Sequence, residues 1–170
     1  MSVLHQMPEP SVQAQPKPMQ ILAKYHSNAP VNVLGIAKEL GLTVWGMDLL
    51  PNISGKIFRD PQNGGPSGFS IAVNSAEPIV RQRFTIAHEI AHFLLHRSQL
   101  EKGDLVDDAM YRSGLSSAEE AAANKMAAHI LMPFSLINSL VSSGVTDVTD
   151  LAARLQVSQT AMKIRLGIPT

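Results

Sequence analysis

The strongest constraint on this chain is an apolar segment, IAHEIAHFLLH, which begins at Ile86 and carries histidines four residues apart. Its composition and its lack of glycine and proline favour a helix. In a helix, residues four positions apart lie on one face about a turn apart, so His88 and His92 present their imidazoles to the same side. Two imidazole nitrogens at that separation can both reach one zinc ion at about 2.0–2.1 Å.

Glu89 completes the pattern H-E-x-x-H. It lies about 100° around the helix from His88, where it is poorly placed as a ligand but well placed to take a proton from an attacking water molecule. The pattern therefore predicts a zinc-dependent hydrolase of peptide bonds, with Glu89 as the catalytic base. The alternative is a pair of partly buried histidines whose rings are satisfied by backbone carbonyls.

A zinc site of this kind needs a third protein ligand, and the chain contains no cysteine to supply one. Glu120 is the best candidate, because it lies on the next predicted helix with Asn124 one turn later on the same face. Asn124 could hydrogen-bond a zinc-binding histidine and fix its orientation, and the alanines between them would let the two helices approach closely. The competing interpretation is that Glu119 and Glu120 simply favour the start of a helix, as acidic residues do.

Other polar residues near this segment are less informative. His96 extends the series of histidines, but it lags by about 40° per step and drifts off the metal face, so a favourable charge in the last helical turn is the simpler interpretation. His129 and Tyr111 could each stabilise an oxyanion, and nothing in the sequence selects between them. Arg81 and Arg83 are expected on a solvated face.

The order of predicted elements is helices, then strands, then helices, which indicates an α+β fold with a small antiparallel sheet. Two helices are expected in residues 19–41, and strand character follows from Leu42. Residues 53–58 and 69–73 are predicted to form a hairpin, with a long mobile loop between them. The later helices are expected at 74–96 with Asn74 or Ser75 as the cap, at 117–132 with Ser117 as the cap, and at 134–167 with a break at Gly144 and a second cap at Thr149.

Composition limits the classes of protein to which this chain can belong. It has 14 basic and 14 acidic residues and a formal net charge of zero, so no global field would draw it to nucleic acid or to an anionic membrane. The N-terminus lacks the charged and apolar regions of a signal peptide, and no apolar run approaches the roughly 20 residues that span a bilayer. A cytoplasmic protein is expected, with no membrane partner.

Two stretches resemble the ImmA/IrrE family of zinc metallo-endopeptidases: VNSAEPIVRQRFTIAHEIAHFLLH, and EEAAANKMAAHILMP further along the chain. The strands GKIF and FSIAVN and the closing LAARLQVSQTAMKIRLGI also fit, so that the resemblance covers residues 20–167. One departure is Met126, where the family more often has phenylalanine. The resemblance implies His88, His92 and Glu120 as ligands of one zinc ion, Glu89 as the base, and Asn124 as the asparagine of the family's E-x-x-x-N pattern.

Residues 1–18 hold four prolines and three glutamines and are expected to form a flexible tail, outside the resemblance. For the rest of the chain we expect a zincin-like (gluzincin-like) metallopeptidase domain at 19–133 and a C-terminal helical region at 134–170 that packs on it. The implied partner is a helix-turn-helix repressor of the Xre type or an antitoxin, whose cleavage would relieve repression in a phage, mobile-element, toxin–antitoxin or stress-response circuit.

Two other functions remain open at this point. A metal-containing protein could regulate its partner by binding it without cleaving it. Residues 150–166 have a helix-turn-helix pattern that could contact DNA directly, but the stretch from residue 151 to the end of the sequence carries only Arg154, Lys163 and Arg165 as basic residues. Three charges give little affinity for phosphates, so direct DNA binding is the weaker expectation.

Overall fold

The computed structural model describes residues 17–102 and 115–170, and the predicted order of elements is confirmed as an α+β fold. The elements are α1 (Pro18–Tyr25), α2 (Val33–Glu39), β1 (Thr43–Met47), β2 (Gly55–Arg59), the 3-10 turn η1 (Gly65–Ser67), β3 (Phe69–Asn74), α3 (Ile79–Leu95), α4 (Arg97–Glu101), α5 (Ser117–Leu131), α6 (Phe134–Ser142), α7 (Val148–Leu155) and α8 (Gln159–Leu166).

The sheet has three strands in the order β1-β3-β2. The predicted hairpin is confirmed, because β2 pairs with β3 in antiparallel register with Ile57 opposite Ile71. A third strand makes this small sheet mixed, since β1 pairs with β3 in parallel, with Val44 opposite the same Ile71. Alternation of apolar residues predicts that a segment is a strand, but it does not predict which neighbour the strand takes or in which direction.

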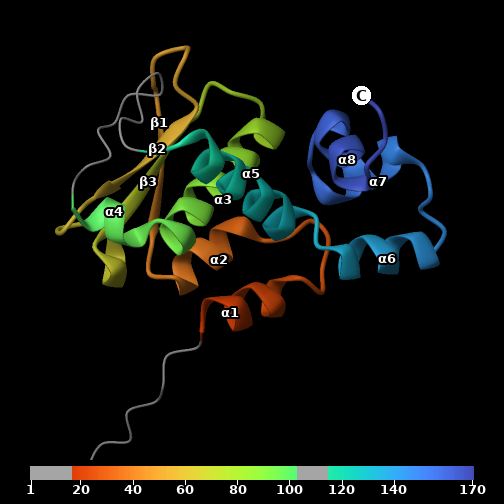
Figure 1. The fold of residues 1–170 in the computed structure, drawn as a ribbon, viewed down its shortest axis with the longest axis horizontal. Helices are drawn as coiled ribbons and strands as arrows, with labels where there is room; N and C mark the ends of the chain where they lie inside the picture. The colour runs from red at the N-terminus through yellow and green to blue at the C-terminus, as the bar shows by residue number, and fades with distance from the viewer. Residues whose placement is uncertain (1–16, 103–114) are drawn as a thin grey trace, which may run out of the picture.

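One face of the sheet is covered by helices and the other is partly exposed. Ile71 is fully buried at the centre of the covered face, with Ile57 beside it in the hydrophobic core. On the opposite face Trp45 is 42% exposed, and its indole Nε1 donates to the hydroxyl of Ser70 at 3.0 Å. In Figure 1 the sheet lies on one side of the molecule, α3 and α5 lie beside it in the middle, and α7 and α8 lie on the far side.

The central helix α3 packs against β2, β3, α2 and α5. It buries residues around most of its circumference, including Ile86 and Ile90, as a helix in the middle of a domain must. The alanines between Glu120 and Asn124 were expected to let α5 approach α3 closely, but only Ala123 among them is fully buried. Ala127, one turn later, is also fully buried, whereas Ala121 and Ala122 are exposed.

Three helix caps differ from the predicted ones by a few residues. Helix α3 begins after Pro78, because Asn74 is the last residue of β3 and its amide donates to the carbonyls of Leu49, Leu50 and Ile53. Helix α5 is capped by Ser116, and α7 is capped by Asp147, whose side chain accepts from the backbone of Thr149 and Asp150. Several adjacent polar residues can cap a helix, so the sequence alone does not choose between them.

The connection between β2 and β3 is held by hydrogen bonds to the first residue of β1 and to the segment that precedes it. The hydroxyl of Thr43 donates to the carbonyl of Asn63 at 2.6 Å, and the backbone N–H of Ser67 donates to the carbonyl of Gly41 at 3.0 Å. This anchors the loop at the end of the sheet where β2 finishes.

The C-terminal helices are fixed to the rest of the molecule by two arginines. Arg83 of α3 is buried and donates to the carbonyl of Gln156, between α7 and α8, and to the carbonyl of Val31 before α2. Arg165 of α8 donates to the carbonyl of Met132 at 2.9 Å, and its guanidinium lies 4.1 Å from the centre of the Phe134 ring. The expectation of a solvated face is therefore wrong for Arg83.

At the N-terminus, residues 1–16 of the expected tail lie outside the described residues, and α1 already begins at Pro18. Among the helices that the structure describes, none combines the length and the apolar character needed to cross a membrane.

Candidate metal centre

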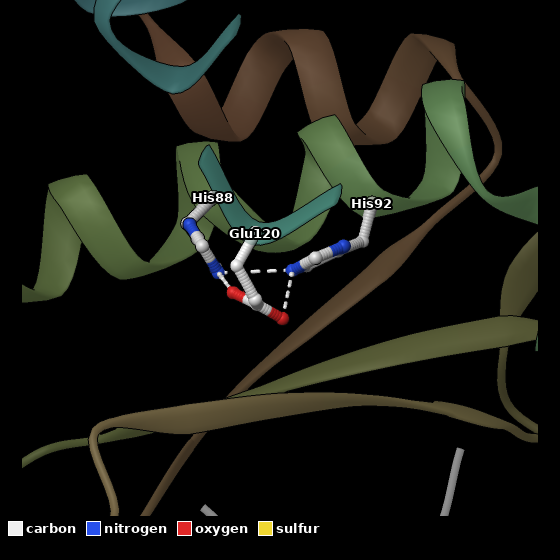
Figure 2. Close-up of side chains that lie close together, drawn as sticks. All are labelled: His88, His92 and Glu120. Carbon is white, nitrogen blue, oxygen red and sulfur yellow. Dashed lines mark hydrogen bonds and ion pairs between the residues drawn. The ribbon is translucent and has the colours of Figure 1, made fainter. Parts of the chain in front are cut away.

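Three side chains from two helices converge on one point (Figure 2). Nε2 of His88 lies 2.9 Å from Nε2 of His92, and the two carboxylate oxygens of Glu120 lie 3.3 Å and 3.4 Å from these nitrogens. His88 and His92 leave α3 side by side, and Glu120 reaches them from the first turn of α5.

The spacing of these atoms fits a metal ion. Ligand atoms placed tetrahedrally around an ion at 2.0–2.1 Å lie about 3.3 Å from one another. Two imidazoles and one carboxylate are also a donor set that zinc accepts when the fourth position is left open for water or substrate. Within the described part of the chain, the cluster of residues able to hold such an ion is His88, His92 and Glu120.

The cap of α5 explains why Glu120, rather than its neighbour, faces the histidines. Glu119 accepts a hydrogen bond from the backbone N–H of Ser116 at 2.7 Å and another from the side chain of Gln99 at 2.8 Å. The bond from Ser116, followed by that from Gln99, holds the pKa of Glu119 below its ordinary value. Glu120 lies about 100° further around the helix and is left to point at the imidazoles.

A cleft of about 1050 Å³ opens beside the cluster. Of the cluster, His88 and Glu120 line this cleft. The predicted base Glu89 lines it as well, although Glu89 is only 1% exposed. The other walls come from the start of β2 at Ser54 and Gly55 and from α8 at Ser158, Thr160, Ala161, Ile164 and Arg165.

The buried ring of His92 also meets a third histidine. Nδ1 of His92 lies 3.0 Å from Nδ1 of His96, and both residues are buried. The available signal was the four-residue spacing from His92 to His96, which repeats the spacing from His88 to His92. Asn124 lies exposed on the wall of the cleft, and its role as a hydrogen-bond partner of a metal-facing histidine stays a prediction.

The other polar residues considered in the sequence differ in where they lie. Tyr111 lies outside the described residues. His129 is not among the residues lining the cleft; its ring instead meets the ring of His26 edge to face at 5.3 Å. Arg81 lines the cleft. The predicted hairpin loop at 59–68 does not, because it starts at the end of β2, whereas the cleft borders Gly55 at the beginning of that strand.

Comparison with known proteins agrees with this geometry. The model of the IrrE N-terminal-like domain, a peptidase family, matches residues 37–167. The radiation response metalloprotease IrrE of Deinococcus deserti is 39% identical over 100 residues, which are 56% of this chain and 35% of that protein. The protein of the same name from Deinococcus radiodurans is 39% identical over 94 residues, which are 52% of this chain and 27% of that protein.

A solved structure, a Mycobacterium tuberculosis transcriptional regulator, superposes with a TM-score of 0.58 at 18% identity, over 89% of this chain and 46% of that one. This likeness supports the fold alone. The chain thus spans only about a third of the length of the curated relatives it matches. Because the family model covers more than half of the sequence and includes the histidine helix and α5, this chain belongs to the peptidase family of IrrE N-terminal-like domains.

Proposed function

We propose that this chain is a zinc-dependent endopeptidase, with His88, His92 and Glu120 as the metal ligands and Glu89 as the catalytic base. The observation that carries the proposal is the convergence of two Nε2 atoms and a carboxylate within 2.9–3.4 Å of one another beside an open cleft. The metalloproteases among its relatives support it.

The division of labour follows from these positions. Zinc would supply a Lewis acid that polarises the substrate carbonyl and lowers the pKa of water to about 7. Glu89 would take the proton from the attacking water and then pass it to the leaving amine. Its burial favours this role, since a carboxylate removed from bulk solvent exchanges its proton with the attacking water and the leaving amine rather than with the surrounding solvent.

The cleft also indicates how a peptide would bind. Strand β2 is an edge strand, and its first residue, Gly55, lines the cleft together with His88 and Glu89. A substrate segment in extended conformation would add to this edge through backbone hydrogen bonds, so that its scissile bond lies at the metal. We expect a substrate that is a protein with an exposed or locally unfolded segment.

The most specific form of the proposal is that the substrate is a helix-turn-helix repressor of the Xre type or an antitoxin, cleaved in the cytoplasm to relieve repression. The sequence resemblance supports this form, and so do the two relatives named for the radiation response, because a radiation response is a stress circuit. The arrangement of α8 favours cleavage over direct DNA binding, because one side of α8 forms a wall of the cleft.

Incubation of the purified chain with the product of its neighbouring gene, with and without a zinc chelator, tests the proposal. We expect a discrete fragment that disappears when zinc is removed. The variant Glu89→Gln should keep zinc but release no fragment. If that variant still inactivates the partner completely, the protein acts by binding rather than by hydrolysis.

A further inference from the structure

His92 contacts His96 through the ring nitrogen that faces away from the proposed metal, and the proposed mechanism gives this contact no role. His92 is 0% exposed and His96 is 9% exposed, so neither Nδ1 atom can exchange its partner readily for bulk water. The two Nδ1 atoms lie 3.0 Å apart, which is an ordinary length for an N–H···N hydrogen bond. His96 ends α3 as its C-cap residue, with φ −127° and ψ 26°, and this non-helical backbone gives its ring a direction that a further helical residue would not have.

The position of the proton in this contact follows from the chemistry of the cluster. Nε2 of His92 is the atom that points at His88 and Glu120, so it must offer its lone pair if it is to bind a metal. A neutral imidazole has one N–H, so the proton of His92 must then be on Nδ1. Nδ1 of His92 therefore donates, and Nδ1 of His96 accepts.

We propose that His96 is a positioning residue of the metal centre: its Nδ1 accepts the Nδ1–H of His92, which fixes both the tautomer and the ring orientation in which Nε2 of His92 faces the ion. The inference rests on the proposed metal site. Histidines that bind metals usually donate their other nitrogen to a carboxylate, a carbonyl or water, and here an imidazole takes that place. The loss of such a partner lowers metal affinity by about 10- to 100-fold.

Two substitutions separate this role from simple packing. His96→Asn keeps a short side chain whose oxygen can accept from His92, while His96→Leu fills the space with an apolar group that cannot accept. A packing role predicts that leucine is the better tolerated residue in this buried position. The positioning role predicts the opposite order for zinc affinity.

The measurement is the zinc dissociation constant, obtained by competition with a chromophoric chelator, for the wild type and both variants. We expect His96→Leu to bind zinc about 10- to 100-fold more weakly and His96→Asn to recover most of that loss. His129→Leu is the matched control, because it replaces another partly buried imidazole that does not line the cleft, and it should bind zinc as the wild type does. Equal affinities for His96→Leu and the wild type would overturn the inference while leaving the metal site intact, and a wild type that binds no zinc would overturn both.

A second readout needs no variant. In the zinc-loaded wild type, nitrogen NMR of the ¹⁵N-labelled histidines should show His92 protonated at Nδ1, with a scalar coupling across the hydrogen bond to Nδ1 of His96. A proton on Nε2 of His92, or an Nδ1–H without coupling to His96, would contradict the inference even if His96→Leu did not fold.

Discussion

The absence of a side chain at Gly55 determines how closely the sheet packs against α3. A Cβ at this position would lie 2.5 Å from the carbonyl oxygen of Ala72 and 2.5 Å from Cγ2 of Thr85. The first is backbone of the neighbouring strand and the second belongs to α3, so neither can move aside easily. Glycine therefore allows β2 to approach α3 closely at the point where β2 borders the cleft.

We expect Gly55→Ala to lower the free energy of unfolding by about 1–3 kcal/mol, because the strand must shift away from α3. Urea titration followed by circular dichroism measures the change. Gly46→Ala in β1 is the control, since the nearest atom to its added Cβ is Cβ of Ser75 at 3.9 Å, an ordinary contact. If both substitutions prove equally mild, close packing at Gly55 is not a constraint on the fold.

At the same scale, the sequence indicated which three side chains lie close together, His88, His92 and Glu120, but it did not indicate the contact of His92 with His96. The spacing of His88 and His92 and the position of Glu120 depend on helix periodicity, which a sequence carries directly. The partner of His92 depends on how α3 ends, and a cap residue with non-helical backbone is not predicted by periodicity. The contact between His92 and His96 was therefore not among the expectations from the sequence.

Between elements, α1 and α5 meet through the rings of His26 and His129. Burial lowers the pKa of both imidazoles, and each is further lowered by a nearby positive charge, that of His129 on His26 and that of Arg165 on His129. The folded protein therefore binds protons at these sites less readily than the unfolded chain does. These two histidines therefore do not reduce the free energy of unfolding above the ordinary histidine pKa of about 6.5. They reduce it as the pH drops below that value, because protons then bind more readily to the unfolded chain.

We accordingly expect the urea midpoint of the wild type to decrease between about pH 7.5 and about pH 5.5. His129→Gln should decrease less, because it removes one of the two groups and also removes the charge that opposes protonation of His26. All other residues are the same in both proteins, so the difference between the two curves isolates the pair. Parallel curves would show that the contact between α1 and α5 does not depend on these protons.

In the whole molecule, Arg83 joins three regions that are distant in sequence. It extends from α3 to the carbonyl of Val31 at 2.8 Å and to that of Gln156 at 3.3 Å, and thus holds the turn between α7 and α8. Burial lowers the pKa of its guanidinium. Because α8 forms a wall of the cleft, Arg83 helps to fix the position of that wall although it does not line the cleft itself.

Arg83→Met should lower the free energy of unfolding by about 3 kcal/mol, since the buried carbonyl of Val31 and the carbonyl of Gln156 lose a charged donor while the volume is nearly kept. Arg154→Met is the matched control, because Arg154 is exposed on α7 and should change stability by less than about 0.5 kcal/mol. Equilibrium unfolding in urea compares the two. An equal decrease in the free energy of unfolding for both variants would indicate a general effect of removing a positive charge, rather than the loss of the hydrogen bonds of Arg83.

The sequence predicted the overall class and the order of elements, because helices and the hairpin follow local patterns. It did not predict the parallel pairing of β1 with β3, nor the docking of α7 and α8 by Arg83 and Arg165. Both depend on contacts between residues far apart in the chain, on which local periodicity gives no information.

The central claim, that one ion is held by two imidazoles of α3 and by the carboxylate at position 120, is tested most directly by zinc binding to a pair of neighbouring variants. Glu119→Gln removes a carboxylate that serves the cap of α5, whereas Glu120→Gln removes the one that faces the histidines. We predict one zinc ion per chain for the wild type and for Glu119→Gln, and an affinity lower by more than about 100-fold for Glu120→Gln. Wild-type affinity in Glu120→Gln would contradict this assignment of the metal centre.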